Sequence, residues 1–451
     1  MDKIGDSQYV LLGEASHGTS EFYSWRTEIS KRLIAEKGFS FIAVEGDWPD
    51  CFKVNMHVKG FSGSNQNTYN IVHSFSRWPT WMWANKEMIE LIEWLKKYND
   101  GIDGIDQKKV GFYGLDIYSL WESMDAIIQY LKKTDPSSLR DAIEAYNCFE
   151  PYNKDVEKYA RAAAFVKENC EEEVIEMLVS LQSRHNLYGK KQKGSREEKE
   201  EHLDVEQNAI TAKNAERYYR TMMRGDVNSW NLRDTHMMDT LERLMDFHGQ
   251  QNNQGVKTRC IVWAHNTHIG DARFTDMAQT GMINLGQLVR ERKGAGNTTL
   301  IGFSTYHGNV IAAREWGEEM MAMDVPPAKE GSWDYFLHSL NNNGGETGTD
   351  KLIIFHKGND IDKLIQKRIQ MNDQDDNNDD DDGDGYYQPR GQRAIGVVYN
   401  SKYEKHGNYV PTVLPLRYDA LLFIDRTNAL SPLHMAPREN RDLPETFPTG
   451  V

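Results

Sequence analysis

Two ionisable side chains lie three residues apart in the run LLGEASHGTSEFYSWR, which spans residues 11–26. Glu14 and His17 follow an apolar stretch and precede a stretch of helical character. A neutral imidazole, with an unperturbed pKa of about 6.5, can take a proton from water at neutral pH. A carboxylate near a helix N-terminus can also act only as a cap. The pair alone is therefore compatible with a reaction centre, a metal site or a helix start.

Further ionisable residues stand where other predicted strands end. Glu45 closes the strand in FSFIAVEG, and Asp116 closes the strand in KVGFYGLD. His265 and His268 follow the strand in VWAHNTHIG. In open α/β sheets, ligands bind outside the carboxyl ends of the strands. If these strands are parallel, all of these side chains meet Glu14 and His17 at one edge of the sheet.

Two kinds of chemistry fit this set of residues. In the first, His17 is a general base, and a neighbouring carboxylate, Glu14 or Glu45, fixes its tautomer. His265 then donates a hydrogen bond to a developing oxyanion or leaving group. In the second, the same histidines and carboxylates bind zinc, manganese or iron, which accept nitrogen and oxygen ligands. The residues by themselves leave both open.

Serine-nucleophile chemistry and nucleotide binding have less support in the sequence. The chain has no GxSxG nucleophile elbow. It also lacks the GxGxxG and GxxxxGK[ST] phosphate loops. Ser304, in GFSTYHG, lies near the end of a predicted strand, where we expect it to assist by hydrogen bonding.

The elements that must position these residues alternate between strand and helix. Helical periodicity predicts helices at 20–37, ended by Gly38 as a C-cap, and at 83–98. Alternation of strands and helices is typical of an α/β protein with a mostly parallel or mixed central sheet flanked by helices. Apolar runs predict the strands, at residues 9–13, 39–46, 109–116, 259–265, 299–306, 351–356, 394–399 and 420–425.

The predicted domain organisation is one core with one insertion. Residues 1–136 and 248–451 form the α/β catalytic core. Residues 137–247 repeat charged and apolar positions at helical period and predict an inserted helical lobe. The charged run at 189–204 predicts a solvated loop or helix face. Residues 373–386 are rich in Asp and Asn and predict an acidic disordered insert, because they cannot bury apolar surface.

Composition restricts the partners and the compartment. The net charge of the 451 residues is −15, which argues against binding to nucleic acid or to an anionic membrane surface. No run approaches the ~20 apolar residues of a membrane helix, and the first residues contain no apolar signal-peptide core. The four cysteines are far apart and predict reduced thiols in a cytoplasmic protein. They are Cys51, Cys148, Cys170 and Cys260. Nothing in the sequence indicates the oligomeric state.

An ordered set of motifs in this sequence resembles the erythromycin esterase family. The set begins with GEASHGTSEFYSWRTEISKRLIAEKGFSFIAVEGDWPD and extends to about residue 433. The later motifs follow in the order of the family: RWPTWMWANKEMIELIEWL, VGFYGLDIYSLWESM, WNLRDTHM, VWAHNTHIGD, GFSTYHGNVIAAREW and YDALLFID. The resemblance implies a mixed-sheet α/β core with the helical lobe over a deep active-site cleft. It also implies hydrolysis of an ester, in the best-known members a macrolide lactone, without an obligatory metal or other cofactor.

The resemblance also implies roles for individual residues. His17 becomes the general base that activates water, and Glu14 becomes its carboxylate partner. Arg26, Glu45 and His265 complete the implied catalytic set. For Arg233, in WNLRD, a salt bridge within the lobe is the alternative to binding substrate oxygens. We expect the substrate-binding residues to be His268, Asp116, Arg233 and Ser304.

Three functions remain possible at this point. The first is a metal-independent hydrolase of a small-molecule ester, with no nucleic-acid or membrane partner. The second is a metal-dependent hydrolase that uses the same histidines and carboxylates. The third is a non-catalytic homologue that binds a small molecule in the same cleft. They differ in bound metal, in sensitivity to chelators and in turnover.

Overall fold

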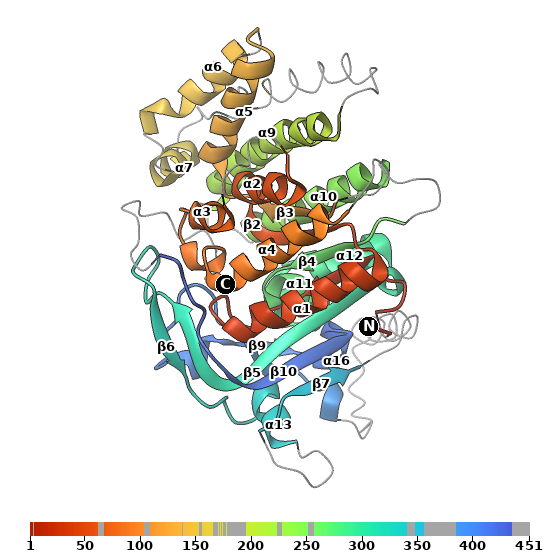
Figure 1. Ribbon diagram of the computed structural model, residues 1–451. Coiled ribbons are helices and arrows are strands. Elements are labelled where there is room, and N and C mark those ends of the chain that lie inside the picture. Colours follow the sequence, from red (N-terminus) through yellow and green to blue (C-terminus); the bar gives the residue numbers. More distant parts are fainter. Residues whose placement is uncertain are drawn as a thin grey trace.

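The computed structural model describes most of the chain, and the statements below apply to the described residues. Figure 1 shows a central sheet with helices on both faces and further helices grouped at one end. The described residues are 1–2, 4–61, 67–102, 109–137, 139–152, 156–165, 195–222, 228–250, 257–340, 348–355 and 385–434, together with Cys170, Glu172, Val174 and Met177.

The central sheet is mostly parallel. Its strand order is β3-β2-β4-β1-β5-β10-β7, and β6 pairs with β5. Neighbouring strands from β3 to β10 run parallel, whereas β6 and β7 are antiparallel to their partners. The prediction of a mostly parallel or mixed sheet flanked by helices is confirmed. The strands are β1 Tyr9–Leu12, β2 Phe41–Asp47, β3 Gly111–Asp116, β4 Cys260–Trp263, β5 Thr298–Ala312, β6 Met321–Val325, β7 Lys351–Ile354 and β10 Ala420–Thr427.

The central strands read as unbroken apolar runs because both of their faces are buried. In β1, Val10 and Leu12 belong to the hydrophobic core on one face of the sheet. Tyr9 and Leu11 belong to the core on the other face. Successive side chains of a strand point to opposite faces, so a run without polar alternation fits a sheet covered on both sides.

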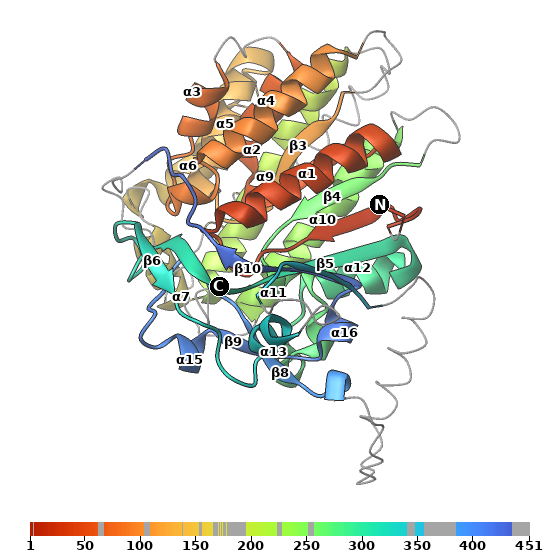
Figure 2. The same cartoon turned by 60° about the horizontal axis from the view of Figure 1, so that its bottom comes forward.

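Helices cover each face of the sheet (Figure 2). α1 Ser20–Lys37 and α4 Lys86–Asp100 bury residues such as Phe22 and Leu91 in the first core. α10 Asn228–Gln250 and α12 Leu285–Lys293 bury residues of the second core. As predicted, α1 is followed by Gly38 in a left-handed conformation, with φ of 67°.

The remaining helices of the predicted insertion form a third core together with α5, which precedes the predicted boundary at residue 137. α5 and α9 pack together with α6 and α7, and their buried residues include Trp121, Phe149 and Tyr218. In Figure 1 these helices lie beyond the end of the sheet. The domain boundaries themselves stay a prediction. The bounds are α5 Leu120–Thr134, α6 Leu139–Phe149, α7 Val156–Phe165 and α9 Arg196–Met222.

Shorter elements complete the described fold. A small antiparallel sheet pairs β8 Arg390–Arg393 with β9 Tyr409–Thr412. The other helices are α2 Trp48–Lys59, α3 Thr68–His73, α11 Asn266–Ile269, α13 Trp333–Ser339, α15 Glu404–Gly407 and α16 Leu414–Arg417.

Two predictions about strands are wrong. Residues 394–399 form only isolated bridges, with Ile395 bonded to the carbonyl of Ala15 and Tyr399 to that of Ala313. The run is apolar because it is buried, and burial alone does not determine the hydrogen-bonding partner. The predicted strand end near Ser304 is also wrong, because β5 continues to Ala312.

The prediction of a solvated charged run at 189–204 is wrong at Glu200, while residues 189–194 lie outside the described residues. Glu200 lies on α9 and is only 3% exposed. Its carboxylate pairs with the ammonium of Lys59, which is also buried, and accepts a hydrogen bond from Tyr113. A charged residue can be buried when an opposite charge and hydrogen bonds accompany it. The acidic segment lies outside the described residues from 373 to 384.

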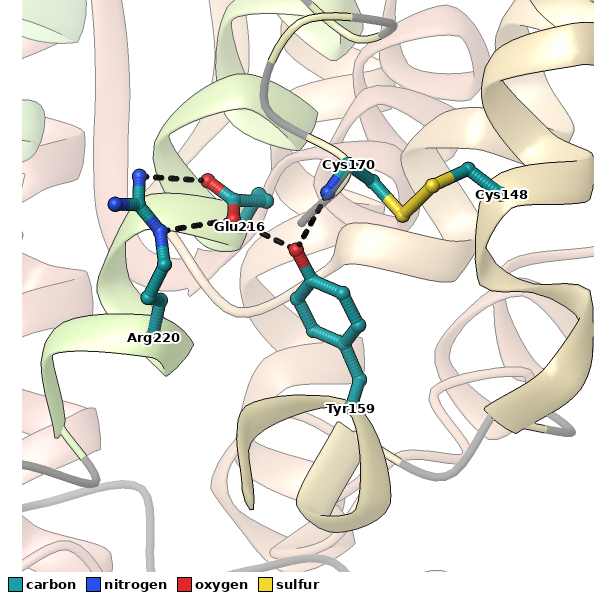
Figure 3. The surroundings of a disulfide bond; sticks show 5 residues. All are labelled: Cys148, Tyr159, Cys170, Glu216 and Arg220. Carbon is teal, nitrogen blue, oxygen red and sulfur yellow. Dashed lines mark hydrogen bonds and ion pairs between the residues drawn. A yellow bond between two sulfur atoms is a disulfide. The ribbon is translucent and has the colours of Figure 1, made fainter. Parts of the chain in front are cut away.

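The prediction of four reduced thiols is wrong for one pair of cysteines. Cys148 and Cys170 form a disulfide, whereas Cys51 and Cys260 are free and buried. Figure 3 shows the hydroxyl of Tyr159 beside this disulfide, where it accepts from the amide of Cys170 at 3.1 Å and donates to Glu216 on α9 at 2.7 Å. The disulfide removes the argument from reduced thiols for a cytoplasmic location.

Removing the disulfide is expected to destabilise the helices around it. The bond closes a loop with a sequence separation of 22 residues. A disulfide that closes a loop of this length restricts the unfolded chain and stabilises the fold by about 3 kcal/mol. We therefore expect the double variant Cys148→Ser/Cys170→Ser to lose about that much unfolding free energy. Urea unfolding followed by circular dichroism measures the loss, and wild type treated with reductant should match the variant. Equal stability of wild type with and without reductant would contradict the disulfide's role.

Membrane insertion has no support from the described helices. None of them combines the length and the apolar character that crossing a bilayer requires.

Candidate active site

The residues predicted at strand ends do come together. Strands β3, β2, β4 and β1 are consecutive and parallel in the sheet, so their carboxyl ends lie side by side. Each residue in this group is at most 4% exposed, and hydrogen bonds, ring contacts or the guanidinium of Arg233 connect them. The group consists of Glu14, His17, Glu45, Asp116, His265 and His268.

His17 and Glu14 form an oriented pair. Nδ1 of His17 lies 2.9 Å from Oε1 of Glu14. The other carboxylate oxygen, Oε2, accepts from Nη2 of Arg26 at 2.6 Å. Arg26 is wholly buried, and its guanidinium lies over the rings of Tyr23 and Trp263, at 4.4 and 4.7 Å. Because Arg26 keeps Glu14 in place as an acceptor for Nδ1–H, the basic lone pair of His17 is at Nε2.

A cavity of about 70 Å³ adjoins His17. This volume exceeds the ~10–15 Å³ that one water requires. One part of its lining is charged and includes Glu45, Asp47, Arg77 and Arg233, while another part is aromatic. The aromatic lining consists of Phe75, Trp78, Trp83, Tyr118 and Trp316. The cavity can therefore hold water beside the imidazole and present an apolar wall to an organic molecule.

His265 supplies a hydrogen-bond donor beside His17. The two rings are 4.8 Å apart between centroids. Nδ1 of His265 accepts from the amide of Thr267 at 3.3 Å and lies 2.8 Å from its hydroxyl. Burial, together with the proximity of His17, holds the pKa of His265 well below its usual value. The ring is therefore neutral with its proton on Nε2, a buried atom that forms no close hydrogen bond, although the backbone of Ala15 favours a protonated ring.

Arg233 is surrounded by a second group of charges. Its Nε and Nη2 donate to Asp116 at 3.0 and 2.7 Å, and Nη2 also donates to Glu45 at 2.6 Å. The other oxygen of Glu45 accepts from the backbone amide of His265 at 2.8 Å. Burial would raise the pKa of Glu45, but His268 and Arg233 outweigh it and hold the pKa well below its usual value. Glu45 is therefore ionised and ties this group to the His265 turn.

The structure modifies several predicted roles. Arg26 acts through Glu14 and does not line the cavity. Asp116 and Arg233 line it, whereas His268 and Ser304 do not. Nε and Nη2 of Arg233 already donate to carboxylates, and Nη1 lies 3.0 Å from Nε2 of His268; these neighbours lie on strand ends and α11 instead of the lobe. The hydroxyl of Ser304 donates to Asp334, away from the cavity.

Three residues of the site lie outside the predicted set. Asp234 bonds Nδ1 of His268 at 2.9 Å, Trp230 stacks on the same ring, and Thr267 sets the tautomer of His265. A signal for two of them was available. Trp230, Arg233 and Asp234 are spaced by three and four residues, which places them on one helix face.

The donor set does not fit a bound metal. The described His, Cys, Asp and Glu residues include no group of three arranged to hold an ion. The guanidinium of Arg233 lies between Glu45, Asp116 and His268, where it neutralises the carboxylates that a metal would need. Nδ1 of His17 is already bonded to Glu14.

Comparison with known proteins identifies a family. The family model described as erythromycin esterase matches residues 34–427. Erythromycin esterase type II of Escherichia coli is 25% identical over 148 residues, which are 32% of this chain and 32% of that protein. The aligned region thus spans about a third of that relative. The family match begins after Glu14 and His17, so the roles of these two residues rest on geometry.

Solved structures share the fold. A protein from Bacillus cereus has a TM-score of 0.70 at 20% identity, covering 96% of this chain and 91% of its own. A succinoglycan biosynthesis protein has a TM-score of 0.67 at 21% identity, with 95% and 90% covered. A mutant erythromycin esterase in its open conformation has a TM-score of 0.59 at 13% identity, with 99% and 94% covered. At these identities the likeness concerns the fold.

Proposed function

We propose, from the premise that this chain belongs to the erythromycin esterase family, that it hydrolyses carboxylic esters with water activated by His17. Family membership supports an esterase-like hydrolase. The observation that carries the proposal is an oriented base with a second imidazole beside it. Glu14 bonds Nδ1 of His17 at 2.9 Å, and the ring of His265 lies 4.8 Å from that imidazole between centroids, just outside the cavity lining.

The proposed reaction has two steps. In the first, Nε2 of His17 takes a proton from water while the water oxygen bonds to the ester carbonyl carbon. Nε2–H of His265 donates to the oxyanion that forms on the carbonyl oxygen. In the second, the C–O bond to the alcohol breaks, and His17 returns its proton to the leaving oxygen. The products are a carboxylic acid and an alcohol, joined in one molecule when the ester is a lactone.

The charges around His17 favour this sequence. Imidazolium forms on His17 during the first step, and the carboxylate of Glu14 accepts from its Nδ1–H. Glu45, Asp116 and Asp234 carry three negative charges, which Arg233 and a protonated His268 reduce to one. The remaining negative charge stabilises a positive imidazole in a buried site, where charges interact more strongly than in water.

The substrate is proposed to be a small-molecule ester, with macrolide lactones as the first class to test. The family name and the E. coli relative support macrolides, and a role in antibiotic resistance would follow from that activity. A screen of erythromycin, simple esters and simple lactones, with products identified by mass spectrometry, tests the proposal. Ligand-induced thermal stabilisation without product would instead support the non-catalytic binding homologue.

Chelation is expected to leave hydrolysis unchanged. Arg233 occupies the position between the carboxylates, so the second hypothesis, a metal-dependent hydrolase, has no suitable ligand group among the described residues. Activity on the best ester of the screen is measured before and after dialysis against EDTA, with metal content determined in parallel. Loss of activity on dialysis and its return with one added divalent metal would contradict the proposal.

A further inference from the structure

We propose that Asp234 is a positioning residue for the hydrolysis, which acts through His268 and Glu45 to hold the turn that carries His265. This inference rests on the proposed function and extends it to a residue outside the cavity lining. Asp234 is wholly buried on α10, one residue beyond Arg233.

The His268 ring is held from three sides. Nδ1 lies 2.9 and 3.0 Å from the two oxygens of Asp234. The indole of Trp230 stacks on the ring at 4.6 Å with an angle of 8° between the planes. Nε2 lies 3.3 Å from Glu45 and 3.0 Å from Nη1 of Arg233. The ring is 0% exposed, so its orientation is set by these contacts.

The two neighbours of Nε2 suit different protonation states. A protonated Nε2 donates to Glu45, whereas an unprotonated Nε2 accepts from Arg233. Burial would lower the pKa of His268, but the carboxylates of Asp234 and Glu45 raise it to about 9. The ring is therefore a cation at neutral pH, and its Nε2–H donates to the carboxylate of Glu45.

Glu45 connects the His268 cation to the backbone of the reaction centre. One oxygen of Glu45 faces His268 and Arg233, and the other accepts from the backbone amide of His265. Without Asp234, the ring loses its proton at a lower pH, and an unprotonated Nε2 accepts from Nη1 of Arg233 instead of donating to Glu45. Glu45 then loses one donor and the adjacent positive charge, so the anchor of the His265 turn loosens.

The described groups around the ring set the expected pH dependence. Asp234 and Arg233 face it from α10, and Glu45 faces it from β2. Asp116 of β3 acts through Arg233, and His265 precedes His268 at the start of α11. α12 and β5 also pack on α11, but they bring no described charged side chain within hydrogen-bond distance of the ring.

The test compares Asp234→Asn, Asp234→Glu and wild type in two measurements. The first is the pH dependence of kcat on the best ester of the screen. The second is the titration of the His268 ring by ¹H–¹⁵N NMR, assigned by the signal lost in His268→Gln.

Since the His268 cation is the active form, kcat falls as pH rises through the pKa of His268. Loss of an adjacent opposite charge shifts a pKa by ~1–3 units, so Asp234→Asn should move both the titration and the alkaline limb of kcat down by that amount.

If the alkaline limb of the kcat–pH profile moves to about pH 7, only about one-tenth of the molecules carry a charged His268 ring at pH 8. The value of kcat at pH 8 then falls about tenfold. KM should change less, because Asp234 does not line the cavity. Asp234→Glu should keep the limb near its wild-type position. Asp271→Asn is the matched control, because Asp271 is equally buried and pairs with Arg290, away from the cavity. It should lower stability without moving the limb.

The outcomes separate this inference from the proposed function. An unmoved alkaline limb in folded Asp234→Asn, with wild type active and His17→Ala inactive, overturns the positioning role alone. A displaced His268 titration with an unmoved limb overturns it as well. A wild type that hydrolyses no ester overturns both proposals, whatever the NMR titration shows.

Discussion

His17→Ala is expected to slow ester hydrolysis by ~10²–10⁴-fold, the usual effect of losing a general base. The variant retains Glu14, Arg26 and His265, but it loses the imidazole nitrogen that accepts the proton of the attacking water. The loss should appear in kcat, with a smaller change in KM, since the imidazole acts mainly in the transition state. Steady-state kinetics on the best ester of the screen measure both constants.

Two controls accompany this experiment. Added imidazole should restore part of the activity of His17→Ala, because the missing group is a free base in an accessible cavity. His57→Ala removes another buried histidine, one on α2 that does not line the cavity, and should keep near-wild-type kcat if it folds. Turnover by His17→Ala within threefold of wild type would refute the assignment of the base.

Lys59→Met is expected to lower the unfolding free energy by ~3–5 kcal/mol, because it leaves the buried carboxylate of Glu200 without its cation. The ammonium of Lys59 bonds Glu200 and the hydroxyl of Tyr113, the latter at 2.8 Å. Glu200 also accepts from Asn55 at 2.9 Å, so α9 is tied through these groups to α2 and β3. Urea unfolding of the variant measures the loss.

A double-mutant cycle distinguishes charge from packing in this prediction. Lys59→Met/Glu200→Leu should be less destabilised than the sum of the two single variants, because it leaves neither charge unpaired. Lys133→Met is the matched surface control. Lys133 pairs with Glu201, the next residue of α9, at 3.1 Å and is 70% exposed, so its removal should change stability little. Additive single losses would show that the pair itself is not coupled.

The strand pattern of the sequence predicted most of the sheet. The runs containing Leu11, Val44 and Val262 are continuous and apolar because helices cover both faces of the strands that they form. The pattern failed where apolar residues are buried but form no regular hydrogen bonds to a neighbouring strand. Val397 is 5% exposed in an irregular segment, and its hydrophobicity was mistaken for strand character. β6 lies outside the predicted strands, because its short run MAMDV is interrupted by Asp324 and is mostly exposed, with only Val325 buried.

The site was predictable where it depends on strand ends. Glu14, Glu45 and Asp116 follow apolar runs directly, and parallel strands bring such positions to one edge. Asp234 was not predictable in this way, because it lies mid-helix and reaches the edge only through the packing of α10 on the sheet. The same holds for the pairing of Cys148 with Cys170, since cysteine spacing does not determine connectivity.

The sequence by itself placed ionisable side chains at the ends of apolar runs, and the alternation of strands with helices favours parallel strands whose carboxyl ends share one edge. It also placed Glu14 and His17 on one turn. Only the tertiary structure decided what each of them does. It put Arg26 behind Glu14, Arg233 where a metal would lie, and the proton of His265 on Nε2, since tautomers and ion pairs depend on partners that are distant in the chain.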